Sequence, residues 1–362
     1  MAGNSSPWVP NYELGLWGQT KNRWIAEGLP VDQVYLGDMF EGEPFFRLDR
    51  RAFIRIDCGP IPRFEYQVIE ENDRYLIARH EDGVVTKALK EGTVAGTRPC
   101  MDNYLEFPVK DRKTWKEVKK RFNPLTPIRY PLWLDKLVKM WQERDYPLCL
   151  LGNGSFGLYS QLRRWLGTEA LSYLFYDDPA LIEEMVEFTA EFLLNLVEKV
   201  IIQVQPDYFN FFEDCAGKGG PLFGPEIFRR FFSRPYRRII DRLTNAGITS
   251  FWVDSDGNID VLIPLWLEVG INCFWPLEQA SGMDPRRLRQ KFGKAMVLCG
   301  GLDKRALSKD KKAIEEELYA KIPPLVEQGG YIPHIDHIIP PDVPYSNFQY
   351  YLELKWKLLG RG

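Results

Sequence analysis

Residues 250–278 read SFWVDSDGNIDVLIPLWLEVGINCFWPLE, and this stretch contains the unit that decides the fold. A short apolar run, 250–256, is followed by a helix-like stretch, 258–270, which ends in glycine, as helices often do. A second apolar run, 272–278, comes next. Two short strands separated by a helix predict a βαβ unit, in which the strands lie parallel in one sheet. Both runs finish in acidic residues.

The same alternation of strand and helix continues on both sides of this unit, from about residue 147 onwards. The further candidate strands are 148–153, 208–215, 296–303 and 331–337, and the further candidate helices are 180–201, 225–247, 284–293 and 310–330. Nearly every candidate strand ends in polar or charged residues. In a TIM barrel the carboxyl ends of the strands converge on one face, where the active site lies. Six such ends, with two more expected in the less regular N-terminal half, predict an α/β fold of the (β/α)8 TIM barrel type.

A doubly wound parallel sheet is the alternative architecture. Such a sheet normally has a glycine-rich turn of the form GxGxxG after its first strand, and no such motif follows a strand here. The nearest glycine-rich loop, GNGSFG at 152–157, lacks the lysine of a phosphate-binding loop. The barrel is therefore the favoured architecture.

The first third of the chain has a different pattern. Between residues 46 and 90, apolar and polar residues alternate in three runs, with turn signals at 72–73 and 82–83. This alternation predicts an antiparallel β-meander. We therefore divide the chain into an N-terminal extension with the β-meander, 1–110, and the main part of the TIM barrel, 111–362, within a single catalytic domain overall.

Composition excludes several classes of protein. Of the 362 residues, 47 are Lys or Arg and 50 are Asp or Glu, which gives a formal net charge of -3. The sequence has neither a basic stripe that would bind nucleic acid nor an apolar run long enough to span a membrane. The N-terminal residues do not read as a signal peptide, so we expect a cytoplasmic protein. The six cysteines are scattered without a CxxC motif, which argues against a disulfide framework.

Five stretches, by their order and spacing, resemble the uroporphyrinogen decarboxylase superfamily. They are DYFNFFEDCAGKGGPLFGPEIFRRFFSRPYRRIID (207–241), VDSDGN (253–258), NCFWPLE (272–278), VLCGGLDKRAL (297–307) and GGYIPHIDHIIPPDVPYSNFQYY (329–351). The similarity covers roughly residues 147–355 and implies a TIM barrel. The superfamily includes uroporphyrinogen decarboxylases, zinc-dependent methylcobalamin:coenzyme M methyltransferases, and the substrate methyltransferases of corrinoid-dependent O-demethylases.

The first third of the chain argues against the decarboxylase branch. Uroporphyrinogen decarboxylases carry an N-terminal motif similar to RQAGRYLPEY, whose arginines bind the many carboxylates of the substrate, and this chain has no such motif. Four arginines are present in that part of the chain, at positions 47, 50, 51 and 55. They lie in a polar–apolar alternation that is typical of a solvated strand face.

The resemblance to the coenzyme M methyltransferases implies a metal site of altered composition. Those enzymes have HxCGN where this chain has the residues 254–258, and a further cysteine near the position of His337. Asp254, Asp256 and His337 thus occupy the ligand positions. Two carboxylates and an imidazole can hold zinc and leave one position open. Oxygen ligands leave the ion more Lewis acidic, which suits activation of an ether or phenol oxygen.

The candidate site residues all follow candidate strands. The candidate catalytic residues are Glu213, Asp254 and Asp256; the candidate metal ligands are Asp254, Asp256, His337 and Glu213; the candidate substrate-binding residues are Glu278, Trp252 and Asn153. Structural roles remain open for several of them. Asp256 is also placed to cap the following helix, Glu213 to form an ion pair with Lys218, and His337 to bond loop backbone. For His334 the backbone-bonded role is the expectation.

The resemblance implies an enzyme that moves a methyl group from a methylated small molecule, methoxy-aryl or similar, to a corrinoid protein, with zinc activating the leaving atom. The alternative is a decarboxylase of a tetrapyrrole or another carboxylated substrate, without metal, in which Asp254 or Asp256 handles the proton. A barrel that only carries a corrinoid or tetrapyrrole is a third hypothesis. The oligomeric state is open between a monomer and the homodimer that is common among the decarboxylases.

Overall fold

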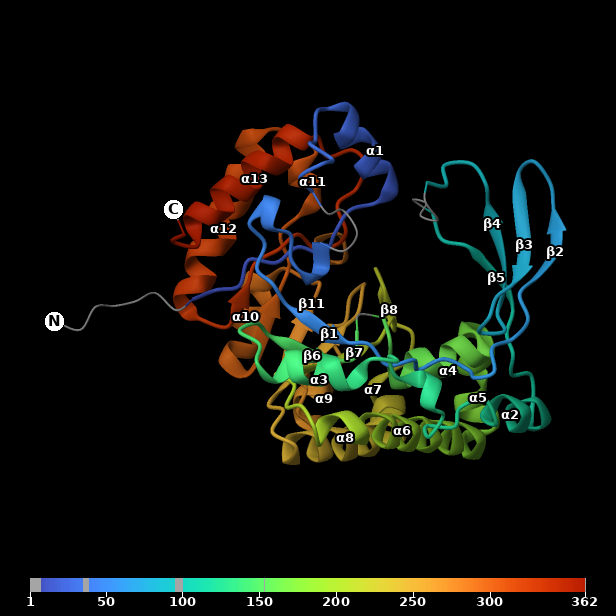
Figure 1. The fold of residues 1–362 in the computed structure, drawn as a ribbon. Coiled ribbons are helices and arrows are strands. Elements are labelled where there is room, and N and C mark those ends of the chain that lie inside the picture. The colour runs from blue at the N-terminus through green and yellow to red at the C-terminus, as the bar shows by residue number, and fades with distance from the viewer. Residues whose placement is uncertain (1–7, 35–38, 95–99, 153, 362) are drawn as a thin grey trace.

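A seven-stranded parallel sheet forms the centre of the molecule (Figure 1). The structure is a computed structural model, and it describes residues 8–34, 39–94, 100–152 and 154–361. The strand order is β1 (Ala52–Ile54), β6 (Leu148–Leu150), β7 (Tyr208–Phe212), β10 (Ser250–Asp254), β11 (Cys273–Trp275), β12 (Val297–Cys299) and β13 (Tyr331–Ile332). Each neighbouring pair is parallel. The predicted α/β fold of the TIM-barrel type is confirmed.

Helices follow the strands and cover the sheet, with α6 and α8 along one side and α12 and α13 along another (Figure 1). The helices are α1 (Gly18–Ala26), α2 (Arg112–Lys119), α3 (Leu134–Gln142), α4 (Leu158–Leu166), α5 (Thr168–Asp177), α6 (Pro179–Ile201), α7 (Pro225–Ile227), α8 (Ser233–Asn245), α9 (Ile263–Val269), α10 (Pro285–Phe292), α11 (Lys304–Leu307), α12 (Lys311–Gln328) and α13 (Tyr345–Leu358). Local sequence sets their ends: Asp178 caps α6, and Gly270, with a φ of +105°, ends α9. In the described part of the chain, no helix is long and apolar enough to cross a membrane.

The inner faces of the strands meet in an apolar cluster of their own. Its buried members are Phe40, Phe53, Cys149, Tyr208, Trp252, Cys273, Trp275 and Cys299. Phe40, from the turn Met39–Glu41, lies with its ring centroid 5.1 Å from that of Phe53 on β1 and 5.5 Å from that of Trp275 on β11. Since one side chain reaches strands that are not neighbours, the sheet is curved around a common interior, as in a barrel.

The segment Asn11–Trp17 lies between the two ends of this sheet. On one side, Asp49 N–H, just before β1, donates to Asn11 O at 2.9 Å. On the other side, Ile339 N–H, after β13, donates to Gly15 O at 3.0 Å. Within this segment the Glu13 carboxylate accepts a hydrogen bond from Lys355 Nζ of α13 at 2.5 Å, and both side chains are fully buried. A buried ion pair thus fastens the segment to the C-terminal helix.

The antiparallel meander has four strands, β2 (Gln67–Glu71), β3 (Tyr75–Arg79), β4 (Val85–Leu89) and β5 (Asn103–Glu106). They form a sheet that projects from the barrel (Figure 1). The sequence prediction extended the meander back to residue 46, and this part is wrong, because β1 pairs in parallel with β6, with Phe53 opposite Cys149. Both Phe53 and Ile54 are buried, one on each face, so this short strand belongs to the barrel wall.

Replacement of Glu13 by alanine tests the closure of the barrel. The substitution leaves the Lys355 ammonium group buried without its carboxylate, and we expect the free energy of unfolding to fall by about 3–5 kcal/mol in urea denaturation. The control is Glu117→Ala, which breaks an exposed pair with Lys120 on α2, and we expect it to cost less than about 1 kcal/mol. Equal effects of the two substitutions would contradict the role given to the buried pair.

Candidate functional site

The candidate site lies at the carboxyl ends of β7, β10 and β11. Asp254 is the last residue of β10, and its register partners are Phe212 on β7 and Trp275 on β11. Its backbone oxygen accepts a hydrogen bond from Glu213 N–H at 2.7 Å, and the next residue, Ser255, donates its N–H to Trp275 O at 3.0 Å. The backbone around Asp254 is therefore fixed by both neighbouring strands.

The turn after β10 is held by Glu278 and by a close approach of backbone. Gly257 has a φ of +77°, and its N–H donates to Glu278 Oε2 at 2.9 Å. A Cβ at this position would lie 2.6 Å from the backbone of Ala216, so only glycine fits. The structure thus gives Glu278, a predicted substrate-binding residue, a hydrogen bond that shapes the turn carrying Asp256.

Asp254 is a buried carboxylic acid, with 7% of its surface exposed. In the part of the chain that the structure describes, no hydrogen bond to its carboxyl group is found. Burial raises the pKa of Asp254 well above its ordinary value, and the nearby negative charges of Asp256, Asp214 and Cys299 raise it further. Both causes favour the protonated form of the carboxyl group, which is the form that can act as an acid.

Asp256, two residues after Asp254, forms a pair with His337 at the rim of the barrel. His337 Nε2 lies 3.4 Å from Asp256 Oδ2, and both side chains are partly exposed. The Trp17 ring is nearly parallel to the His337 ring, with an interplanar angle of 17° and centroids 6.4 Å apart. The structure therefore brings together two of the predicted site residues from β10 and from the segment after β13. Both side chains are partly exposed to solvent, where a substrate can reach them.

Glu213 is bonded to protein groups instead of facing this rim. Its carboxylate accepts hydrogen bonds from Leu158 N–H at 2.5 Å and Ser160 N–H at 3.0 Å, and the Tyr236 hydroxyl donates to it as well. These N–H groups lie in the first turn of α4, whose N-cap residue, Gly157, has no side chain to cap the helix. Burial raises the pKa of Glu213 to about 7, while the hydrogen bond from Tyr236 and those from the α4 backbone oppose the rise.

The remaining predicted residues lie elsewhere. Trp252 is part of the barrel interior, where its ring centroid is 4.7 Å from that of Tyr208 and its Nε1 donates to Ser250 Oγ at 2.9 Å. Asn153 lies outside the described residues. His334 is bonded to backbone as predicted, with its Nδ1 2.6 Å from Ile335 O. Its other ring nitrogen is 3.3 Å from Cys299 Sγ, so both groups belong to the interior below the rim.

The four predicted metal ligands do not assemble into a metal site. The Glu213 carboxylate is occupied by α4 and Tyr236, which leaves Asp254, Asp256 and His337. Among the residues that the structure describes, no three His, Cys, Asp or Glu side chains form a group that could hold a metal ion. Zinc binding by these residues therefore stays a prediction.

Sequence reasoning missed two contributors to the rim. Trp17 comes from the N-terminal segment, which carried no signal of its own beyond an aromatic residue. Lys304 lies between two carboxylates, with its Nζ 3.8 Å from both Glu278 Oε1 and Asp336 Oδ1. Asp336 is 1% exposed, and burial raises its pKa although Lys304 opposes the rise. An acid at the end of the candidate strand 331–337 was the available signal for Asp336.

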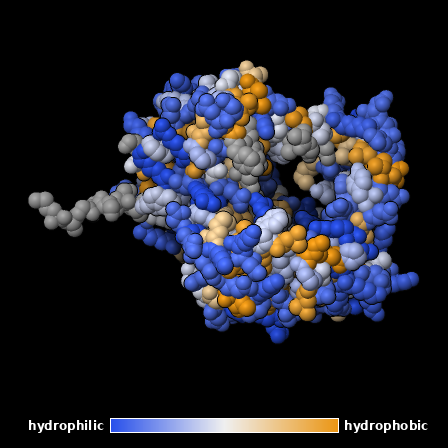
Figure 2. Space-filling model, viewed as in Figure 1, coloured by the Kyte–Doolittle hydropathy of each residue, from blue (hydrophilic) through white to orange (hydrophobic). Residues whose placement is uncertain are grey.

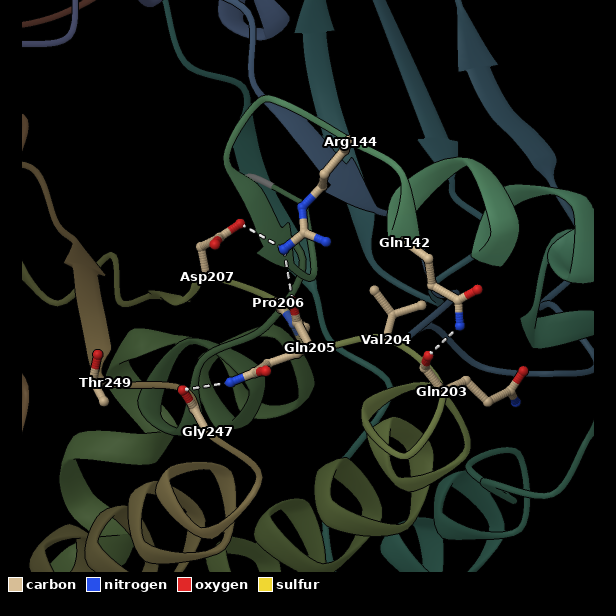
Figure 3. A pocket seen from close by; sticks show the side chains of 9 residues that line it. All are labelled: Gln142, Arg144, Gln203, Val204, Gln205, Pro206, Asp207, Gly247 and Thr249. Carbon is tan, nitrogen blue, oxygen red and sulfur yellow. Dashed lines mark hydrogen bonds and ion pairs between the residues drawn. The ribbon is translucent and has the colours of Figure 1, made fainter.

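A large cavity at the opposite end of the barrel is a poor candidate for the site (Figure 3). Its volume is about 520 Å³, and it lies at the amino ends of β7 and β10, next to Asp207 and Thr249. Its polar side chains bond to one another or to backbone: Arg144 donates to Asp207 Oδ2 at 2.9 Å, and Gln205 to Gly247 O at 3.3 Å. Active sites of TIM barrels lie at the other, carboxyl face.

Comparisons with known proteins agree with this architecture. A family model described as "Uroporphyrinogen decarboxylase (URO-D)" matches residues 97–355. Among solved structures, a methyltransferase from Methanosarcina mazei superposes with a TM-score of 0.56 at 12% sequence identity, over 97% of this chain and 94% of that one. At this identity the likeness concerns the fold. No curated protein matches the sequence.

Replacement of Glu213 by alanine separates a structural role from a chemical one. The substitution leaves the N–H groups of Leu158 and Ser160 and the Tyr236 hydroxyl without their acceptor in a buried place. We expect the free energy of unfolding to fall by about 3 kcal/mol or more, measured by urea denaturation. The Glu213→Gln variant keeps one acceptor oxygen, so its free energy of unfolding should fall by less. Unchanged stability with lost activity would instead make Glu213 a catalytic residue.

Proposed function

The chain belongs to the uroporphyrinogen decarboxylase (URO-D) family, and from this premise we propose that it is a methyltransferase. Its substrate would be a methylated small molecule, methoxy-aryl or similar, and its methyl acceptor a corrinoid protein. The fold and the family indicate an enzyme, and the fold is shared with a methyltransferase. The observation that carries the proposal is the buried carboxyl group of Asp254 at the rim of the barrel, whose pKa burial raises well above its ordinary value.

Asp254 supplies what removal of a methyl group from oxygen requires. When the C–O bond breaks, the electron pair stays on the oxygen, and an alkoxide or phenolate is a poor leaving group unless it receives a proton. A carboxyl group that is protonated at neutral pH can give this proton as the bond breaks. Burial excludes water that would compete for the same proton.

The neighbours of Asp254 position the substrate. Asp256 and His337 present a hydrogen-bonding pair at the open side of the rim, and the Trp17 ring, next to His337, offers an apolar face. A corrinoid carried by a partner protein would supply the nucleophile that takes the methyl group. The partner has to approach this rim, because the barrel interior below Asp254 is filled by Trp252, Trp275 and Phe40. No step is assigned to zinc.

Decarboxylation is the second candidate, and the same acid favours it, because Asp254 can also protonate a carbon that has lost carbon dioxide. Three of the four arginines of the first third, Arg50, Arg51 and Arg55, line one cavity at the start of β1, but Asp254 does not line that cavity, and each of the four arginines already has a partner in the protein. Arg47 packs over Trp356, Arg50 over Tyr146 and Arg51 over Phe40, while Arg55 pairs with Glu41. Methyl transfer is therefore the preferred function.

The activity test uses Asp254→Asn, which keeps the shape of the side chain and removes its acidic proton. With 4-methoxybenzoate as donor and free cob(I)alamin as acceptor, methyl transfer can be followed by the change in corrinoid absorbance. We expect the substitution to lower kcat by about 10²–10⁴-fold, the range for loss of a general acid. Activity of the variant within a factor of three of wild type would exclude Asp254 as the acid.

The same substitution tests the proton on Asp254 without any substrate. In the unfolded chain Asp254 loses its proton near pH 4, whereas the folded protein holds it to higher pH, so this group lowers stability as the pH rises above 4. Each pKa unit corresponds to about 1.4 kcal/mol. We expect Asp254→Asn to raise the free energy of unfolding at pH 7 and to change it little at pH 4. A loss of stability at pH 7 would contradict a protonated Asp254.

A further inference from the structure

A second cavity, of about 390 Å³, lies between the meander sheet and the carboxyl rim of the barrel. Its walls come from β5 and the turn between β3 and β4, from α4 and the start of α5, and from the end of β7. Figure 2 shows the surface hollowed between the projecting sheet and the rest of the molecule. Cavities of a few hundred cubic ångströms between two structural units commonly bind small molecules.

Aromatic side chains line one part of this cavity. Tyr104 and Phe107 come from β5 and the residues after it, and Phe212 is the last residue of β7. The rings of Tyr104 and Phe107 are parallel within 6°, with centroids 6.3 Å apart. Phe107 is held in place because it packs on Gly167, where a Cβ would lie 2.3 Å from its ring. Parallel aromatic rings favour a flat aromatic ligand.

The charged groups of the cavity leave one cation without a partner. Arg163 donates to Asp214 Oδ2 at 2.6 Å, so these two charges compensate each other. Asp82 accepts a hydrogen bond from Val84 N–H at 3.0 Å, within its own turn. Arg164 lines the cavity with an exposed side chain, and within the described residues it makes no hydrogen bond or ion pair. A guanidinium group binds a carboxylate through two parallel hydrogen bonds.

The cavity adjoins the proposed acid. Phe212, in its wall, is the register partner of Asp254, and the Asp214 charge is one of those that raise the pKa of Asp254. A ring bound against Tyr104, Phe107 and Phe212 would therefore lie next to the rim, in the same cavity that Arg164 lines. A volume of about 390 Å³ has room for a single ring with two substituents.

We infer that this cavity is the substrate pocket, and that it takes a single aromatic ring with a carboxylate that Arg164 binds and a methylated oxygen directed to the rim. The inference rests on the proposed function for the methylated group, but the recognition of an aromatic carboxylate can be measured apart from any reaction. The sheet formed by β2–β5 would then contribute to the aromatic wall of the pocket, through Tyr104 of β5.

Calorimetric titration of the purified protein with two matched probes tests the inference. The probes are 4-methoxybenzoate and its neutral isostere 4-methoxybenzamide. We expect the carboxylate to bind roughly ten-fold tighter or better, since a hydrogen bond to a charged group contributes about 1.5–3 kcal/mol. Arg164→Gln should abolish this difference, and Tyr104→Ala should weaken both probes. Both side chains are exposed, so the variants should fold, and the control Arg234→Gln on α8, which does not line the pocket, should bind like wild type.

Three results would overturn the inference: no saturable binding of either probe below about 10 mM, equal affinity for the two probes, or an Arg164→Gln variant that still prefers the carboxylate. The proposed reaction is tested independently of the proposed pocket. If both probes bind as expected but no methyl group reaches cob(I)alamin, the result supports the substrate pocket and contradicts the proposed methyl transfer. If methyl transfer depends on Asp254 but not on Arg164, the result supports the proposed reaction and contradicts the proposed substrate pocket.

Discussion

The burial of one carboxyl group, Asp254, at the end of a parallel strand is the constraint on which the rest of the site depends. A carboxylate there would be costly, because it would lie out of water, near other negative charges, and without a hydrogen-bond donor among the described residues. The group is held in place nonetheless, since hydrogen bonds from Glu213 N–H and from Ser255 N–H fix the backbone on both sides. The same cost raises the pKa of Asp254, and in the proposed reaction the proton that this favours is the one that the leaving oxygen receives.

Several other features serve to hold that rim. The Glu213 carboxylate joins the end of β7 to the start of α4 and to Tyr236 of α8, so three parts of the barrel meet at one buried group. Glu278 fixes the turn at Gly257, which carries Asp256 to within reach of His337. The buried pair of Glu13 and Lys355 fastens the N-terminal segment across the gap in the sheet, and this segment brings Trp17 to the same rim.

The parallel sheet and its helices were predictable from sequence, because apolar strands and amphipathic helices leave periodic patterns that depend on local residues. Asp254 and Asp256 were found through the same logic, as polar ends of buried strands. The role of Glu213 could not be found in this way. Its partners, the first N–H groups of α4, are about fifty-five residues away in the chain, and only the missing side-chain cap at Gly157 hints at them. Similarly, β1 was placed in the meander because alternation alone does not distinguish a half-exposed strand from one with both faces buried.

The most direct test of this account is the protonation state of Asp254 in the folded enzyme. Infrared difference spectra between wild type and Asp254→Asn at pH 7 separate the carbonyl stretch of a protonated carboxyl group from the bands of ionised carboxylates. We expect wild type to show a protonated carboxyl band that the variant lacks. If the difference spectrum shows only the loss of an ionised carboxylate, Asp254 is charged at neutral pH, and its role as the acid of the site is excluded.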